Sequence, residues 1–487
     1  MVGARVGCCL AVVVAGCHAR PPCSPNGPAP PGALAADAVL LDVSEGQDAL
    51  YYLSHPRDNG GGWAFDLWWK PLPTGEARCV SAGVGVPGRV GSTLFLHGLD
   101  EEIWVPALAE PWPLGRGVEN LSASCDGRTL IYWRSRSVEG IAMPGDLMLL
   151  STDDCSAAGC QPRVLASDVK LSLPVVSWDG RHAAITVPGD GHTELRVLDL
   201  TAHKAAVVLD TPAPQYFDFP VVSPTGQRVA VVLRNSPLAV PATLLHLKVF
   251  DTASGAEVPW AEPTTSWLPE LRFLDEQTLL ATTEDQGAWK VYLVGTSAVA
   301  LLSTTTQLPF VGPEAKGYLI EQMFAASFAR SEVRILDSSN PGSATELTSV
   351  GAGGISLDGQ LQRVAFFENQ DPQTFQATLV VASFPDGQRL ASFDGVPDGL
   401  EGASWLGSAA GFAQGGESLL FLDGVAPLGQ GGRLHAFRDG VDQILAEGVS
   451  DFRTRSSPGT VYYTQSGVQP TFGPPRTGTI LARPLAP

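Results

Sequence analysis

The stretch Ser177-Trp-Asp-Gly180, followed at once by Arg181-His-Ala-Ala-Ile185, decides how this chain folds. Its first part is a turn, with Asp in the middle and Gly at a position where a positive φ costs little. Its second part begins a run of residues that favour β-strands. The same phrase returns, each time before a similar run, at Ser124-Cys-Asp-Gly127, Ser223-Pro-Thr-Gly226, Ser356-Leu-Asp-Gly359 and Ser457-Pro-Gly459. It predicts a repeated turn that leads into a strand.

The copies are regularly spaced along the chain. Their turn glycines are Gly127, Gly180, Gly226, Gly359 and Gly459. The separations of 53, 46, 133 and 100 residues are close to one, one, three and two periods of about 40–50 residues. Between the copies, short apolar runs alternate with turn clusters, and no stretch sustains the period of a helix over three turns. The pattern predicts an all-β repeat protein.

The repeated phrase resembles the TolB-type, WD-repeat-like β-propeller repeats of bacterial envelope proteins. In those repeats a second strand ends on Asp before a turn, as this chain does at Asp199, Asp251 and Asp337. The resemblance covers most of residues 40–485 and is clear in five units; around Leu274-Asp-Glu-Gln277 the glycine or serine is lost. It implies a β-propeller of antiparallel strands, a closed ring that removes exposed strand edges.

Counting the units leaves three alternatives open. Candidate first strands begin near Leu50, Leu94, Leu130, Ala183, Val229, Leu279, Tyr318, Val364, Leu419 and Val461. These are nine units and a C-terminal partial one. The ring is large, or some units are insertions, or the terminal pieces jointly form one blade. We expect about eight blades, with seven to nine allowed.

The N-terminus predicts export. Residues 1–16 combine Arg5 with an apolar run from Cys8 to Ala15, as in a secretory signal peptide. Val14-Ala-Gly-Cys17 resembles the lipobox of bacterial lipoproteins, which implies acylation of Cys17 and cleavage before it. The alternative is an ordinary signal peptide with an incidental cysteine. His18, which is not an aspartate, implies the outer membrane of the bacterial cell envelope by the same resemblance, with the membrane face left open.

Residues 17–36 then form a predicted lipidated, Pro-rich spacer, because six prolines fall within residues 21–31. Residues 37–487 form the predicted propeller domain. The net charge of the whole chain is −19, from 31 Lys and Arg against 50 Asp and Glu. Residues 37–487 carry −21, since Arg5 and Arg20 lie before them. This balance argues against a nucleic-acid partner and favours cationic ones.

Five cysteines remain after the signal peptide and Cys17 are set aside. An exported chain can keep disulfides. Cys155-Ser-Ala-Ala-Gly-Cys160 lies between two strands, so we expect a bridge that closes this hairpin loop. Cys79 and Cys125 could link neighbouring units, which leaves Cys23 unpaired in the spacer. A metal site at Cys155 and Cys160 is the alternative, but no nearby Cys or His completes four ligands, so no metal is expected.

Catalytic signatures are missing from the sequence. There is no Gly-x-Ser-x-Gly elbow, no His-Glu-x-x-His pair and no phosphate-binding loop, and the eight histidines are scattered. The turn residues Asp126, Asp179 and Asp358 could be calcium ligands. However, Asp in a tight turn normally bonds its own backbone, so we interpret Asp126–Gly127, Asp179–Gly180, Gly226 and Asp358–Gly359 as structural anchors. No cofactor is expected.

One aromatic strand stands out. In Trp63-Ala-Phe-Asp-Leu-Trp-Trp-Lys70, the residues Trp63, Phe65, Leu67 and Trp69 share one strand face and Asp66, Trp68 and Lys70 share the other. Trp68 is either an exposed contact for a partner or packs between blades.

These observations favour a non-enzymatic, lipid-anchored propeller that binds a protein or another envelope component. The alternative is a propeller hydrolase or lyase that acts on envelope or extracellular polymers through a site built from several loops. A third possibility is a ring that only supports envelope architecture.

Overall fold

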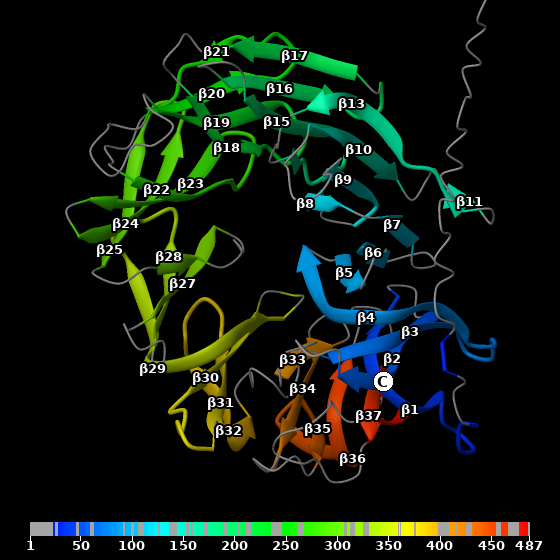
Figure 1. The fold of residues 1–487 in the computed structure, drawn as a ribbon. Helices are drawn as coiled ribbons and strands as arrows, with labels where there is room; N and C mark the ends of the chain where they lie inside the picture. The colour runs from blue at the N-terminus through cyan, green and yellow to red at the C-terminus, as the bar shows by residue number, and fades with distance from the viewer. Residues whose placement is uncertain are drawn as a thin grey trace, which may run out of the picture.

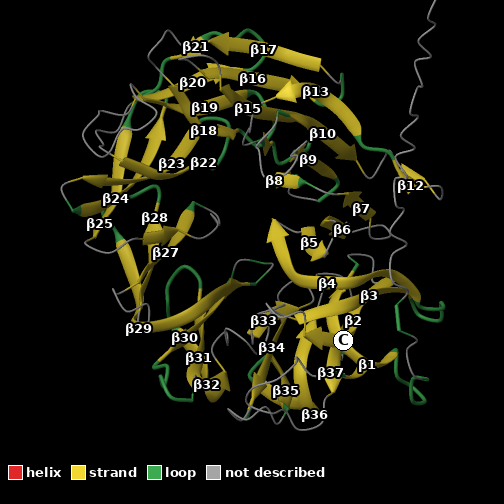
Figure 2. Cartoon of the chain, viewed as in Figure 1, coloured by secondary structure: helices red, strands yellow, loops and turns green. Residues whose placement is uncertain are grey.

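The computed structural model describes most of the chain between residues 23 and 485. Residues 1–22 and 486–487 are not described, nor are internal segments of which the longest are 136–143, 235–245, 398–409 and 466–476. The described residues form β-strands joined by turns and contain no helix, and so none that could span a membrane. Figure 2 shows this all-strand composition.

The strands pair in antiparallel groups of four, which we call units. The first five units contain, in chain order, β1 (Ala35–Val43), β2 (Ala49–Asp58), β3 (Trp63–Pro71) and β4 (Arg78–Val90); β4, β5 (Thr93–Gly98), β6 (Glu102–Val105) and β7 (Trp112–Gly115); β8 (Val118–Ala123), β9 (Thr129–Arg134), β10 (Gly145–Ser151) and β13 (Arg163–Val169); β14 (Val175–Val176), β15 (His182–Pro188), β16 (Thr193–Asp199) and β17 (Lys204–Asp210); and β18 (Tyr216–Val222), β19 (Arg228–Arg234), β20 (His246–Asp251) and β21 (Glu257–Val258). β11 (Cys155–Ser156) and β12 (Gly159–Cys160) form a separate small ladder.

The later units contain β22 (Trp267–Phe273), β23 (Thr278–Asp285), β24 (Ala288–Gly295) and β25 (Val299–Thr305); β26 (Pro309–Val311), β27 (Tyr318–Phe324), β28 (Ser331–Asp337) and β29 (Ala344–Leu357); β29, β30 (Arg363–Glu368), β31 (Gln376–Ser383) and β32 (Arg389–Pro397); β33 (Ala410–Ala413), β34 (Ser418–Asp423), β35 (Gly432–Arg438) and β36 (Val441–Arg453); and β36, β37 (Thr460–Gln465), β38 (Gly478–Pro484) and β1. The units follow one another around a ring, and the last lies beside the first (Figure 1).

Four strands bend and serve two units each. β4, β29 and β36 pair through their first half with the preceding strand and through their second half with the following one. β1 does the same at the seam of the ring: Ala35 and Ala38 pair with β38, and Ala38 to Val43 pair with β2. Residues with positive φ mark three of the bends, at Asp37, Gly83 and Gly448.

The prediction of an all-β propeller is confirmed, but its blade count is not. The described strands divide into ten units, against the predicted eight or the allowed seven to nine. Each predicted start falls in the second strand of a unit, from Leu50 in β2 to Val461 in β37. The partial C-terminal unit is completed by β1, so the terminal pieces do jointly form one unit without lowering the count.

The core lies between the units, because strands such as β9 and β30 bury side chains on both faces. In β9, Leu130 and Tyr132 pack against Leu114 of the preceding unit, whereas Ile131 packs against Ala183 and Ile185 of the following unit. Successive residues of a strand point to opposite faces, which explains this division. Such strands read as continuous apolar runs because no face is left to water.

The seam between the last and first units is built like the other interfaces. Leu40, Tyr52, Tyr462 and Ile480 pack together there and are almost completely buried. The Leu40 amide donates a hydrogen bond of 3.1 Å to Thr464 Oγ1, on the other side of the seam. Ring closure is therefore stabilised by apolar burial as well as by strand pairing.

Leu40→Ala tests the seam. Leu40 is fully buried, so its truncation leaves a cavity and should lower the free energy of unfolding by about 2–4 kcal/mol. Denaturant titration measures the effect. In the matched control Val441→Ala, at a side chain 67% exposed, stability should change by at most about 0.5 kcal/mol. Equal effects of the two variants would contradict closure through this interface.

Candidate functional site

The two faces of β3 have different surroundings. Phe65, Leu67 and Trp69 lie in one apolar cluster of the first unit, as the sequence pattern predicts for that face. Asp66, Trp68 and Lys70 lie on the other face, where they contact the N-terminal segment of the same chain. We call the described part of this segment, Cys23, Ser24 and residues 28–34, the strap.

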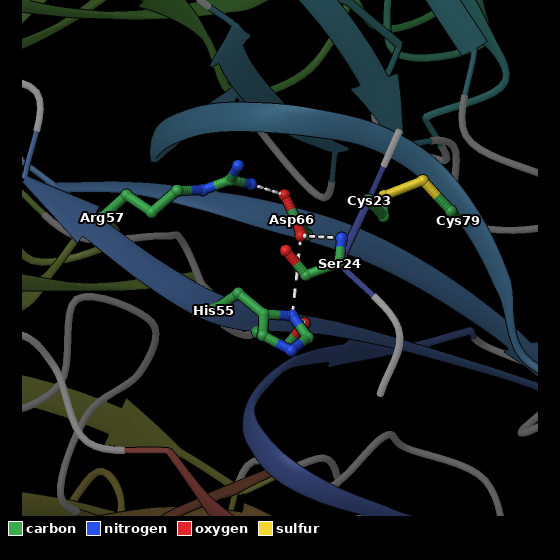
Figure 3. The surroundings of a disulfide bond; sticks show 7 residues. Cys23, Ser24, His55, Arg57, Asp66 and Cys79 are labelled. Atoms are coloured by element: carbon green, nitrogen blue, oxygen red, sulfur yellow. Dashed lines mark hydrogen bonds and ion pairs between the residues drawn. A yellow bond between two sulfur atoms is a disulfide. The ribbon is translucent and has the colours of Figure 1, made fainter. Parts of the chain in front are cut away.

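Asp66 is fully buried and holds the beginning of the strap. The Ser24 amide donates a hydrogen bond of 2.8 Å to Asp66 Oδ2 (Figure 3). The Arg57 guanidinium donates to Oδ1, and His55 Nδ1 lies 3.5 Å from Oδ2. Burying an unpaired carboxylate costs free energy, and these three groups offset that cost for Asp66.

Cys23 of the strap forms a disulfide with Cys79 of β4 (Figure 3). The Cα atoms are 6.0 Å apart, within the range that a disulfide spans. Cys79 is therefore bonded to Cys23 and not to Cys125 as predicted, and Cys23 is not unpaired. The two cysteines are 56 residues apart, and no sequence pattern indicates that the spacer lies beside β4. Cys125 lies outside the described residues.

Trp68 and Lys70 hold the end of the strap. Trp68 is half-buried, packs with Leu34 and Leu72 against the seam cluster, and stacks on Tyr52 with ring centroids 6.3 Å apart. Lys70 Nζ donates a hydrogen bond of 2.6 Å to the carbonyl of Leu34. Of the two predicted roles of Trp68, the structure shows packing between the first and last units and not an exposed partner contact.

The repeated turns are held by their first residue, the serine. Ser124, Ser177 and Ser223 are buried, and the hydroxyl of each accepts a hydrogen bond of 2.9–3.0 Å from the amide five residues later. The predicted anchors contribute as well. Asp179 Oδ1 accepts from the Arg181 amide, and Gly127, Gly180 and Gly226 have positive φ.

Two further predicted anchors have other roles: Gly226 packs tightly against the preceding unit, and Asp358 stands in for the serine. A Cβ on Gly226 would lie 2.2 Å from His182 Nδ1 of the preceding unit, so this turn needs glycine. In the eighth unit Asp358 takes the role of the serine: its Oδ1 accepts from the Gln362 amide, and its Oδ2 pairs with Arg363 at 3.0 Å. Asp126 and Gly359 lie outside the described residues, as does Cys17.

The aspartates at the ends of the predicted second strands, which are the third strands of their units, are turn caps. Asp199, Asp251 and Asp337 each accept hydrogen bonds from the residues two or three positions later. Hydrogen bonds from the Ala202 amide and the Thr201 hydroxyl lower the pKa of Asp199, and those from Ser254 and Ser339 do the same for Asp251 and Asp337. No group of three or more possible metal ligands occurs in the described part of the chain.

The backbone pairs Cys155 with Cys160 across the β11–β12 ladder. This register brings together the two residues that the predicted hairpin bridge would join. The bridge itself stays a prediction.

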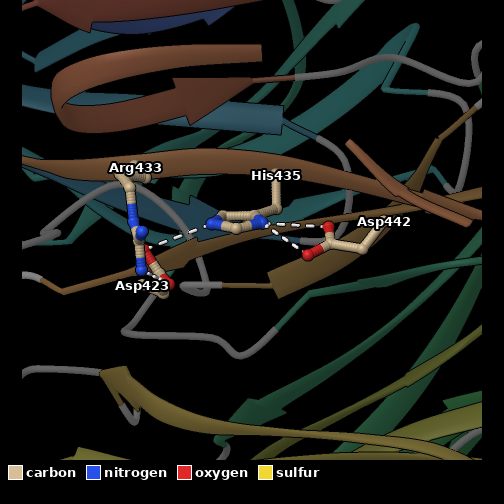
Figure 4. A network of polar contacts seen from close by, with 4 residues as sticks. All are labelled: Asp423, Arg433, His435 and Asp442. Carbon is tan, nitrogen blue, oxygen red and sulfur yellow. Dashed lines mark hydrogen bonds and ion pairs between the residues drawn. The ribbon is translucent and has the colours of Figure 1, made fainter. Parts of the chain in front are cut away.

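Sequence reasoning missed a polar network around His435. Nδ1 of this buried histidine in β35 lies 2.9 Å from Asp442 Oδ1, and Nε2 lies 3.2 Å from Asp423 Oδ1 (Figure 4). Arg433 Nε and Nη2 donate to the two oxygens of Asp423 at 2.8 and 2.5 Å. Phe421 stacks on the imidazole at 4.8 Å. These residues meet only when β34, β35 and β36 pair, so the sequence alone does not indicate the network.

The His435 network is suited to holding strands rather than to catalysis. Both ring nitrogens face carboxylates, and the residue is only 5% exposed. Burial by itself would raise the pKa of Asp423, but the hydrogen bond from Arg433 and the charges of His435 and Arg433 outweigh it and hold that pKa below its usual range. The network ties β34, β35 and β36 together beside the interface of the eighth and ninth units.

An exposed tryptophan lies in one of the repeated turns. Trp178 is 52% exposed, between the buried Ser177 and the turn-forming Asp179. The Asp179 amide also donates to the Pro224 carbonyl in the turn of the next unit, at 3.2 Å. The backbone under Trp178 is therefore fixed from two sides while its ring faces solvent. In the sequence, Trp178 occupies the variable position of the repeated Ser-x-Asp-Gly turn, and this position could have indicated an exposed side chain.

No protein-family model and no curated protein matches this sequence. Among solved structures, one described as the crystal structure of the eukaryotic initiation factor is 11% identical with a TM-score of 0.52, over 85% of this chain and 97% of that chain. The β-propeller domain of the Trilobed protease from Pyrococcus furiosus is 11% identical with a TM-score of 0.36, over 71% and 95%. The Dos1 propeller is 12% identical with a TM-score of 0.39, over 68% and 89%. At these identities the similarity concerns the fold alone.

Asp423→Asn tests the His435 network through its pH dependence. The folded-state pKa of Asp423 lies below its unfolded value of about 4, so the ionised carboxylate stabilises the fold above that pH. This contribution is lost as the pH falls through the folded-state pKa. The variant should lose about 1–3 kcal/mol at neutral pH and a smaller further amount on acidification. Denaturation curves between pH 7 and pH 3 measure both effects.

Glu417→Gln is the control, because its side chain is 49% exposed and pairs with Arg438 at the surface. It should change stability by less than about 1 kcal/mol. A wild type and an Asp423→Asn variant that lose stability in parallel on acidification would contradict the network's role.

Proposed function

We propose that this chain is a lipid-anchored, non-enzymatic β-propeller of the bacterial cell envelope that binds a protein or another envelope component. The Cys23–Cys79 disulfide carries the proposal. Disulfides persist mainly in proteins exported from the cytoplasm, which agrees with the signal peptide and lipobox predicted in residues 1–17. The outer membrane remains the proposed location, on the resemblance at His18.

The binding role is supported by the acidic charge and by the way the ring presents its turns. Residues 37–487 carry −21, which attracts cationic partners. Fixed turns on one rim, such as the one that carries Trp178, present side chains without an ordering cost on binding. Trp178 is the proposed partner contact, since tryptophan is enriched in binding hot spots.

The enzyme hypothesis has less support. The described residue closest to a catalytic arrangement is His435, and it is buried with both nitrogens facing carboxylates. A general base must reach a proton on a substrate, which this position does not offer. A site assembled from the loops outside the described residues would be needed.

Cys17→Ala tests the anchor. The wild type should fractionate with membranes and be released by detergent but not by high salt, because an acyl chain holds it by apolar burial. The variant should appear in the soluble envelope fraction. Cys9→Ala, within the predicted signal peptide, is the control and should leave fractionation unchanged. Membrane retention of Cys17→Ala would refute the lipid anchor.

Trp178→Ala tests the proposed contact. Chemical cross-linking in intact cells, followed by isolation of the protein, should give a discrete adduct that weakens about tenfold or more in this variant, as for a hot-spot residue. The variant should melt like the wild type, because the side chain is exposed. Leu390→Ala, at a position 51% exposed, should keep the adduct. Equal adducts in both variants would place the contact elsewhere.

A further inference from the structure

The strap is fixed at both of its ends. Upstream, the Cys23–Cys79 disulfide and the Ser24–Asp66 hydrogen bond attach it to β4 and β3. Downstream, the Leu34 amide donates to the Ile480 carbonyl at 2.8 Å, and β1 begins at Ala35. The predicted spacer of residues 17–36 is therefore not one free tether, since its second half lies on the first unit.

The disulfide decides how far a lipid on Cys17 could lie from the ring. This step rests on the proposed acylation of Cys17. Five residues separate Cys17 from Cys23, so an extended chain reaches at most about 20 Å. Without the bridge, the described upstream end of the strap is attached by the Ser24–Asp66 hydrogen bond, which is weak enough to open. The first residue that is then fixed in the sheet is Ala35. The tether would then span 18 Cα steps and reach about 60 Å.

The point of attachment is on the outside of the ring. β4 pairs through Arg78 to Val84 as the fourth strand of its unit, and Cys79 lies next to the turn of residues 72–77. Glu76, Ala77, Arg78 and Cys79 are exposed. A lipid held within about 20 Å of Cys79 therefore brings this edge close to the bilayer, and not the opposite side of the ring.

We propose that the Cys23–Cys79 disulfide sets the tether length, and that it holds the β3–β4 edge of the first unit against the lipid bilayer. The opposite side of the ring is then left open to a partner. Because Cys79 is exposed, a dithiol reductant can reach the bridge. The dithiol gives two electrons and two protons to the bridge and is itself oxidised to a disulfide. Cys23 and Cys79 become thiols, and the ring is released to the longer tether.

Resonance energy transfer tests this inference on the full lipidated chain in vesicles. A donor dye is attached at Glu76→p-azidophenylalanine, and phospholipids with labelled headgroups are the acceptors. Transfer should be high in the oxidised protein and fall by about twofold or more after dithiothreitol, because the reachable distance about triples. Unchanged transfer after complete reduction would overturn the proposal.

Two double variants separate the bridge from other effects of the reductant. Cys23→Ser with Cys79→Ser should start at the low transfer and not respond. Cys155→Ser with Cys160→Ser should keep the full response of the wild type. A response lost in the second variant, or kept in the first, would overturn the assignment to Cys23–Cys79. Reduction of the labelled protein needs no cysteine substitution, so the test survives a cysteine variant that fails to fold.

Failure of the anchor is visible separately. Transfer is measured only on protein that floats with the vesicles, and Cys17→Ala should not float. Wild type that fails to float, or Cys17→Ala that does, overturns the lipid anchor and the tether with it. Correct flotation with unchanged transfer overturns the tether length alone.

Discussion

The pairing of β1, the first strand, with both β2 and the last strand, β38, is the interaction on which the ring depends. β1 joins β38 through Ala35 and Ala38 and joins β2 through the residues that follow. Without it, β2 and β38 would present unpaired backbone groups, and the Leu40–Ile480 cluster would face water. In the described residues β1 pairs with β38 only at Ala35 and Ala38, so other contacts are needed to hold β1 at the seam. The strap, which leads into β1, supplies some of them from one side.

From the other side, a buried charge pair reinforces the same seam. Arg453 of β36 donates through Nε to the Leu41 carbonyl at 3.2 Å and through Nη1 to Asp451 at 2.6 Å. Burial raises the pKa of Asp451, against the opposing influence of Arg453. Removing either partner would leave the other buried and uncompensated, which makes such a pair specific for one geometry. The last and first units are thus joined by strand pairing, apolar packing and this charge pair.

Local features of the chain could be predicted from sequence, and long-range pairings could not. The turn at Gly180 and the strand that follows Arg181 could be predicted, because both depend on the backbone preferences of neighbouring residues. The two faces of β3 followed from strand alternation. The predicted strand starts lie one in each of the ten described units, whereas the expectation of about eight blades followed the usual size of a propeller and is not confirmed. Cys23 and Cys79 are 56 residues apart, so no local pattern joins them. The His435 network lies within residues 423–442, but its contacts depend on the pairing of β34, β35 and β36. The role of Ser177 is visible only in its hydrogen bond.

The strap links this architecture to the proposed function. The face of β3 with Asp66, Trp68 and Lys70 binds the protein's own N-terminal segment, so the feature that suggested a partner site belongs to the attachment of the ring. Digestion of the mature protein under non-reducing conditions, followed by mass spectrometry of the linked peptides, tests this most directly. The account predicts a peptide pair that joins Cys23 to Cys79. A pair that joins Cys79 to Cys125, or a free Cys23 in the oxidised protein, would contradict it.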